Sequence, residues 1–207
     1  MRTVALVDLG MGNLHSVRRA LERASEMTGL EIRVERTSDP EALRRADQLV
    51  VPGQGAFRDC AAALAGGLGE ALRDRIAAGV PFLGICLGLQ ALFATSEEAE
   101  GALGLGIFPG SVRKLAKAPG VKIPHMGWNQ VEAVGAPQPV LRGGPTHFYF
   151  VHSYHAVPDD PALVCAVTDH GPNRVTAAIA RDNVLATQFH PEKSQAAGLE
   201  LLSRFLG

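Results

Sequence analysis

Cysteine is scarce in this sequence, and an excess of charge of either sign is missing. The three cysteines, Cys60, Cys86 and Cys165, are odd in number and widely spaced. That pattern argues against a disulfide framework and predicts a reducing, cytoplasmic location. Twenty basic and 21 acidic residues leave a net charge of −1. No overall field would therefore attract nucleic acid or an anionic membrane, and we expect neither as a partner.

Long hydrophobic runs, repeats and low-complexity tracts are also missing. No apolar run reaches the roughly 18 residues of a membrane span, and the N-terminal stretch "MRTVALVD" becomes acidic too soon for a signal peptide. The candidate linkers, 116–120 and 135–139, are short enough to be loops. With 207 residues, 46% of them apolar, the chain can bury a core without cross-links. We expect one domain over residues 1–207.

The first half of the chain alternates strand-like and helix-like segments. Strands are predicted at "TVALVDLG" (3–10), "EIRVER" (31–36), "QLVV" (48–51) and "VPFLGI" (80–85). A helix is predicted where apolar residues recur at helical spacing before a closing glycine, at Leu14, Val17, Leu21, Ala24 and Gly29. Another helix should start at Ser38-Asp39-Pro40-Glu41, and 70–79 also looks helical. Such alternation predicts a parallel sheet covered on both faces.

The second half has strands with little helix between them. They are "HFYFV" (147–151), "LVCAV" (163–167), "VTAAIA" (175–180) and "VLATQF" (184–189), followed by a final helix over 194–205. The predicted fold class is α/β, with a mixed, mainly parallel sheet flanked by helices and an antiparallel section.

One cysteine has glycine two residues away on each side, in "GICLG" (84–88). A lone buried thiol usually packs in the core. Gly-x-Cys-x-Gly at a strand-to-helix junction, however, has the shape of a nucleophile elbow, where small neighbours let the backbone close in. A helix N-terminus also favours the thiolate. Cys86 is therefore a candidate nucleophile, whereas Cys60 and Cys165 are read as core residues.

A base for this thiol is offered by "FHPEK" (189–193), at the end of a buried strand. Pro191 favours an extended backbone at His190. In an extended segment, residues two apart project to the same side, so Glu192 could orient the imidazole of His190. A loop histidine beside a solvated glutamate is the alternative for this tripeptide alone.

Donors for an oxyanion are offered by "VVPGQGAF" (50–57), which follows a buried strand. Glycine permits either peptide orientation, so the N–H of Gly53 or Gln54 could join that of Leu87. Taken alone, the segment would be read as a plain turn.

Two further patterns carry no cofactor or metal prediction. Gly10-Met11-Gly12 follows the first strand, but His15 occupies the third glycine position of a dinucleotide fingerprint. The three histidines His147, His152 and His155 lie among strand aromatics, without cysteine or carboxylate partners. We expect no cofactor and no metal.

The motifs P-G-x-G (52–55), G-x-C-x-G-x-Q (84–90) and H-P-E (190–192), in this order and spacing, resemble the class I, triad-type glutamine amidotransferases. The resemblance covers essentially the whole chain. It implies Cys86 as nucleophile on the carboxamide of L-glutamine, His190 as acid and base, and Glu192 as its orienter, with glutamate and ammonia as products. Four residues match substrate-binding positions: Gln90, Gln188, Ser153 and Tyr154.

Within that class, "DLGMGNLHSV" (8–17), "PHMGWNQV" (124–131) and "FYFVHSYHA" (148–156) resemble the glutaminase subunits of imidazole glycerol phosphate synthases, which serve histidine biosynthesis. This implies a heterodimer with a (βα)₈-barrel cyclase that receives the ammonia. Asn13 and Trp128 would lie at the interface, Trp128 in a presented loop. Leu9 and Gln54 depart from the tyrosine and valine that are more usual in the family.

Three alternatives remain open. A cysteine hydrolase of the α/β-hydrolase type shares the elbow, but its acid usually precedes the histidine by a long stretch, whereas Glu192 follows His190 by two residues. The chain could serve another ammonia-using synthase. It could also be a non-catalytic regulatory subunit, against which an intact Cys, His and Glu argue.

Overall fold

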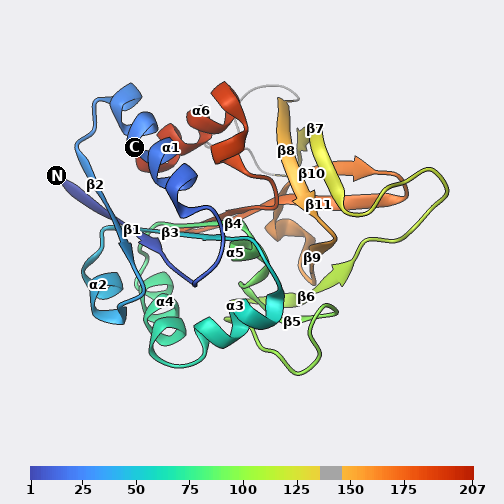
Figure 1. Ribbon diagram of the computed structural model, residues 1–207, viewed down its shortest axis with the longest axis horizontal. Helices are drawn as coiled ribbons and strands as arrows, with labels where there is room; N and C mark the ends of the chain where they lie inside the picture. Colours follow the sequence, from blue (N-terminus) through green and yellow to red (C-terminus); the bar gives the residue numbers. More distant parts are fainter. Residues whose placement is uncertain (136–145) are drawn as a thin grey trace.

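The computed structural model describes residues 1–135 and 146–207 and forms two sheets with helices around the larger one (Figure 1). Residues 136–139 of the second candidate linker lie outside the described residues. The α-helices are α1 (Leu14–Thr28), α2 (Pro40–Arg45), α3 (Phe57–Leu64), α4 (Gly67–Ala77), α5 (Leu87–Gln90) and α6 (Gln195–Leu206), and the 3₁₀ turns are η2 (Pro161–Leu163) and η3 (Pro191–Lys193). The strands are β1 (Arg2–Val7), β2 (Ile32–Thr37), β3 (Gln48–Gly53), β4 (Phe82–Cys86), β5 (Phe93–Ser96), β6 (Phe108–Lys114), β7 (His125–Ala133), β8 (Thr146–His152), β9 (Tyr154–Pro158), β10 (Val164–His170), β11 (Asn173–Arg181) and β12 (Val184–Thr187).

The larger sheet has nine strands in the order β2-β1-β3-β4-β12-β11-β10-β7-β8. Strands β2, β1, β3, β4 and β12 run parallel. From β12 onward each neighbour is antiparallel. The expected mixed sheet with an antiparallel section is confirmed, although its parallel and antiparallel pairings are equal in number. A smaller sheet, β5-β6-β9, lies beside it.

Helices cover both faces of the parallel strands (Figure 1). On one face α1 and α6 lie side by side, and on the other lie α2, α3 and α4. Two buried apolar clusters follow from this, one on each side of the strands. Strands covered on both faces must be apolar on both, which is why β3 and β4 are buried along their whole length.

Helix α1 shows how local sequence determines an element. The Asn13 side chain accepts a hydrogen bond from the Ser16 N–H at 3.1 Å and begins the helix. Gly29 ends it with a left-handed backbone, φ +68°. The predicted apolar face is buried, at Leu14, Val17, Leu21 and Ala24. The start of α2 is confirmed as well, because Asp39 caps the Glu41 N–H and Pro40 occupies the first turn.

Some elements differ from the predictions. The elements α3, β5, β6 and β9 were not anticipated. The segment "PHMGWN" was expected to be a loop, and this is wrong, because Trp128 lies within β7. A proline and a glycine interrupt the strand pattern there, but β7 pairs with β8 from His125↔His152 to Val131↔Thr146. Trp128 remains 48% exposed and packs edge-on against Tyr149.

Candidate active site

Cys86 ends β4 and directly precedes α5, so the chain turns sharply at the thiol. Its backbone has φ +55°, a left-handed conformation that a residue with a side chain rarely adopts. Holding a non-glycine residue there costs about 1–3 kcal/mol and needs support from its surroundings. The sharp strand-to-helix turn expected from the sequence is present.

The two glycines around Cys86 make that support possible. A Cβ at Gly88 would lie 1.9 Å from the Val51 carbonyl oxygen of β3. A Cβ at Gly84 would lie 2.7 Å from the Gly88 carbonyl oxygen. Backbone atoms cannot move away as a flexible side chain can, so both positions exclude any larger residue. The glycines bring α5 against the sheet and thereby hold the turn at Cys86.

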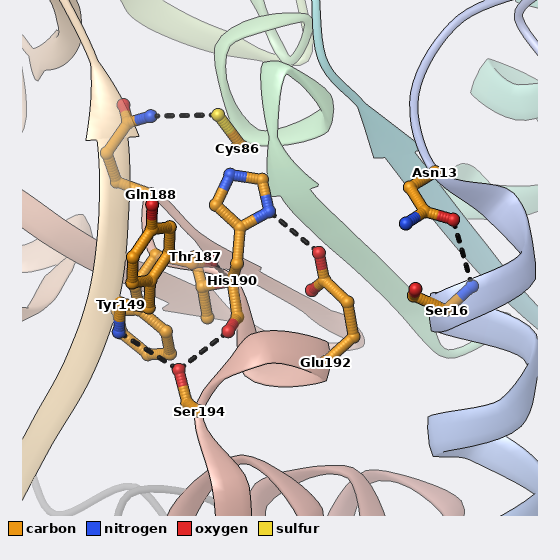
Figure 2. A network of polar contacts seen from close by, with 10 residues as sticks. Asn13, Ser16, Cys86, Tyr149, Thr187, Gln188, His190, Glu192 and Ser194 are labelled. Carbon is orange, nitrogen blue, oxygen red and sulfur yellow. Dashed lines mark hydrogen bonds and ion pairs between the residues drawn. The ribbon is translucent and has the colours of Figure 1, made fainter. Parts of the chain in front are cut away.

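His190 follows β12, the strand beside β4, and its imidazole lies between Cys86 and Glu192 (Figure 2). The two side chains of the His190–Glu192 pair are 1% and 3% exposed, with Nδ1 and Oε1 2.8 Å apart. Ser194 fixes the backbone here, because its hydroxyl donates to the His190 carbonyl at 2.6 Å and accepts from the Tyr149 N–H at 3.0 Å. The strand order thus places the His190 ring beside the thiol, and η3 places Glu192 on the opposite side of that ring.

The charge of His190 reflects three neighbouring influences. Burial alone lowers its pKa, but the adjacent Cys86 sulfur and the Glu192 carboxylate outweigh burial and raise that pKa to about 10. An ionised sulfur and a protonated imidazole would therefore stabilise each other at this position. A positive charge beside a thiol favours the thiolate, the form that acts as a nucleophile.

A cavity of about 460 Å³ opens beside Cys86. Gln90, Ser153 and Tyr154, three of the predicted substrate-binding residues, line it. The fourth, Gln188, is fully buried and donates from Nε2 to Cys86 Sγ at 3.5 Å. Gln188 Oε1 in turn accepts from Gln90 Nε2 at 3.2 Å. The structure thus brings all four residues to one place around the thiol.

The three predicted oxyanion residues lie at the rim of the turn. Gly53, at the end of β3, pairs in register with Cys86. Gln54 and Leu87 line the cavity. The Leu87 N–H belongs to the first turn of α5, so no carbonyl of that helix can accept it. An oxyanion role for Gly53, Gln54 and Leu87 stays a prediction.

The two predicted interface residues lie outside the cavity lining. Asn13 is exposed at the start of α1, and Trp128 is half-exposed on β7. Met126, two residues before Trp128 on the same strand, is 62% exposed. Two large apolar side chains on one strand are thus open to a partner.

Sequence reasoning missed two charged residues that line the cavity, Glu98 and Lys193. Lys193 directly follows the His-Pro-Glu motif, and that position could have indicated it. Glu98 Oε2 accepts from the Phe57 N–H at 3.0 Å, which ties the start of α3 to the cavity. It lies in the acidic stretch "SEEAE", which looks like a solvated surface and gives no such signal.

Within residues 1–135 and 146–207, no group of three histidine, cysteine or carboxylate side chains could hold a metal ion. Across the same residues, no helix combines the length and apolar character needed to span a membrane.

Comparisons with known proteins agree with this geometry. Residues 5–206 match the model of the family "Glutamine amidotransferase class-I". A relative from Methylococcus capsulatus, named imidazole glycerol phosphate synthase subunit HisH, is 50% identical over 100% of this chain and 96% of its own length. A protein of the same name from Nitrosococcus oceani is 48% identical over 100% of this chain and 97% of its own.

Solved structures share the fold at low sequence identity. A putative GMP synthase protein from Thermoplasma acidophilum superposes with a TM-score of 0.72 at 22% identity, over 100% of this chain and 93% of that one. PurLQS from Thermotoga maritima gives a TM-score of 0.73 at 19% identity, over 100% of this chain and 98% of that one. Such likenesses concern the fold alone.

Iodoacetamide at pH 7 should modify Cys86 in the folded chain and spare Cys60 and Cys165. Burial raises the pKa of both spared thiols to about 12, whereas Cys86 borders the cavity and lies beside the imidazole of His190. Peptide mass spectrometry after brief labelling measures the difference. The denatured chain, in which all three cysteines should react, is the control. Equal labelling of the three in the folded chain would contradict this assignment.

Proposed function

Because this chain belongs to the class I glutamine amidotransferase family, we propose that it acts as the glutaminase subunit of an imidazole glycerol phosphate synthase in histidine biosynthesis. Relatives carrying that subunit's name match it at about half identity over the full chain. The observation that supports the proposed chemistry is the placement of the hydrogen-bonded His190–Glu192 pair beside Cys86 at the turn, next to a cavity.

In the proposed reaction, the Cys86 thiolate attacks the carboxamide carbon of L-glutamine. The C–N bond breaks as His190 gives its proton to the departing nitrogen, which leaves as ammonia, and a glutamyl thioester remains. His190 then takes a proton from water as the water oxygen attacks the thioester. The C–S bond breaks, glutamate forms, and Cys86 regains its thiolate beside the protonated imidazole. Glu192 holds the ring in place throughout.

The remaining residues bind the substrate and stabilise charge. The Leu87 N–H, joined by that of Gly53 or Gln54, would stabilise the oxyanion that forms at each attack. Gln90, Gln188, Ser153 and Tyr154 would hold the glutamine in the cavity. Each step uses the side chains and peptide groups of this chain alone, and the proposal requires no cofactor and no metal.

The partner in this proposal is a cyclase subunit with a (βα)₈ barrel, joined in a heterodimer that includes Asn13 and Trp128. The two apolar side chains exposed on β7, Met126 and Trp128, support an interface there. We place the heterodimer in the cytoplasm, as the cysteine content predicts. We further propose that residues 1–207 act as one glutamine amidotransferase domain.

Two alternatives have less support. Another ammonia-using synthase could employ the same fold, but the relatives that match the full chain at about half identity carry the name of the imidazole glycerol phosphate synthase subunit. A regulatory subunit without catalysis would not need a strained cysteine beside a buried histidine that is hydrogen-bonded to a glutamate.

Cys86→Ala should abolish glutamine hydrolysis, because the sulfur forms the thioester. Synthesis by the cyclase complex from added ammonium salt should continue, since that route bypasses the thiol. Glutamate release and product formation are measured in parallel with the wild-type complex. Glutaminase activity near the wild-type level in this variant would refute the nucleophile assignment.

Glu192→Gln should lower glutamine turnover less than His190→Ala does. Removing the general acid and base costs roughly 10²–10⁴ in rate, whereas removing the carboxylate takes away only the anchor and part of the charge that raises the pKa of His190. The kcat of both variants is compared after their circular dichroism spectra are shown to match the wild type. Full activity in both would exclude the triad.

Turnover should also depend on the partner. Ammonia released without an acceptor wastes glutamine, so an oxyanion site that is completed only in the loaded complex has an advantage. Glycine accepts both orientations of the Gly53-Gln54 peptide at low cost, and one missing donor suppresses turnover by roughly 10²–10³.

We therefore expect glutamate release to be slow for the chain alone and to rise by roughly 10²–10³ with the cyclase and its nucleotide substrate. Trp128→Ala should weaken association or this acceleration without unfolding the chain. The rate is measured for the chain alone, with cyclase, and with cyclase plus substrate. Equal rates under all three conditions would refute the gating and leave the glutaminase chemistry intact.

A further inference from the structure

The carbonyl oxygen of Tyr154 joins the active site to a second set of polar side chains. It accepts from Gln90 Nε2 at 3.0 Å and also has the ring of His152 beside it, with Nδ1 at 2.9 Å. Gln90 continues to Gln188 and then to the Cys86 sulfur. One carbonyl thus connects the substrate-binding amides with a histidine that the proposed mechanism does not use.

The direction of the hydrogen bonds beyond Tyr154 follows from this carbonyl, which can only accept. His152 Nδ1 must therefore carry the proton, and in a neutral ring Nε2 is then an acceptor. His125 Nδ1 lies 3.0 Å from that Nε2 and so must donate to it. The Nε2 of a neutral His125 is left as an acceptor, and Asn129 Nδ2 lies 3.1 Å away.

The orientation of the Asn129 amide, at the far end of this series of hydrogen bonds, is fixed as well. Asn129 Nδ2 donates to the Asp169 carbonyl at 2.9 Å, and Asn129 Oδ1 accepts from the Gln130 N–H at 2.8 Å. A flipped amide would lose both contacts. Every donor and acceptor from Asn129 to Tyr154 therefore has one allowed direction, provided both histidines are neutral.

The surroundings keep both rings neutral. Burial lowers the pKa of His125 to about 4, helped by His170, whose ring stacks on it at 4.2 Å. Burial and the neighbouring His125 lower the pKa of His152 to about 3. The other titratable or charged groups around the two rings and Tyr154 are His155, which itself adjoins Arg113 and Glu97, and Lys114, which lies over the Tyr154 ring.

Because these pKa values are lowered in the folded state, the free energy of unfolding should decrease as the pH falls. An unfolded histidine takes up a proton below about pH 6.5, whereas His125 and His152 do not. Their contribution to stability is therefore present above that pH and is lost as the pH falls toward 4 and 3. Protonation of His152 in acid would also place its Nε2–H against the Nδ1–H of His125, where no acceptor remains.

We propose that His152, held by His125, is a positioning residue for glutamine binding: it fixes the Tyr154 carbonyl and thereby the amide orientation of Gln90. With Gln90 Nε2 held by Tyr154 and Gln188, Oε1 is the amide atom left to bind substrate in the cavity that Gln90 lines. This inference rests on the proposed function, because it assigns the cavity to glutamine.

Long-range ¹H–¹⁵N NMR of the wild-type chain at pH 7 tests the hydrogen-bond direction without any assay of activity. Both His125 and His152 should carry the proton on Nδ1 and leave Nε2 unprotonated. A proton on Nε2 of His152 would overturn the inference.

Steady-state kinetics of the complex with cyclase and its nucleotide substrate tests the consequence. His152→Phe keeps an aromatic ring but loses the donor to Tyr154, and should raise the KM for glutamine about tenfold with a smaller change in kcat. His152→Asn places an amide donor where Nδ1 was and should recover most of the wild-type KM. His155→Phe, on the same strand as Tyr154 but outside the hydrogen-bonded chain, is the matched control and should keep the wild-type KM.

An unchanged KM in His152→Phe, or an equal loss in His152→Asn and His152→Phe, would overturn the positioning role. If His152→Phe does not fold, the NMR result decides. A wild-type complex that releases no glutamate would instead refute the proposed function, and the NMR measurement would still test the hydrogen-bond chain.

Discussion

The close approach of two backbones, that of Gly88 in α5 and that of Val51 in β3, is the constraint on which the site depends. It holds α5 against the sheet and keeps Cys86 in its left-handed conformation. The position of the sulfur, the first-turn N–H of Leu87 and the reach of Gln90 toward Gln188 all follow from the placement of α5. A side chain at position 88 would move all three together.

The strand order explains why groups distant in sequence meet at this turn. Cys86 lies at the end of β4, and His190 follows the end of β12, its parallel neighbour. The carboxyl ends of parallel strands are where open α/β sheets bind ligands. The antiparallel strands beyond β12 end with β8, which supplies Tyr149, and the chain continues through Ser153 to Tyr154 in β9 of the smaller sheet. Catalytic groups thus come mainly from the parallel half of the larger sheet, and much of the binding wall comes from β8 and β9.

The parts of the site that the sequence predicted are those with a local signature. Cys86 was found from its flanking glycines. Glu192 was found from its spacing to His190, but the extended segment expected there is wrong, because Pro191–Lys193 form the 3₁₀ turn η3, which still brings the carboxylate to the imidazole. The hydrogen-bonded pair of His125 and His152 could not be found this way. Their contact depends on the register of β7 against β8, and β7 was not recognised because Pro124 and Gly127 interrupt its pattern.

The same distinction applies to the fold. The caps of α1 and α2 were readable because each depends on residues a few positions apart, as with Asn13 and Ser16. The smaller sheet could not be predicted from the sequence, because β9 pairs with β6 across about forty residues, from Gly110↔Pro158 to Lys114↔Tyr154. Glu98 reaches the cavity only because α3 and β5 lie where the tertiary fold places them.

At position 86, stability and catalysis favour different residues, because the backbone there is left-handed. Glycine is the residue that this conformation favours, yet glycine would remove the sulfur. A substitution of Cys86 by glycine would therefore relieve the strained backbone but end catalysis, and only selection for turnover opposes it. A descendant of this chain that kept the fold for a partner but no longer needed glutamine would be expected to carry glycine there, with its core intact.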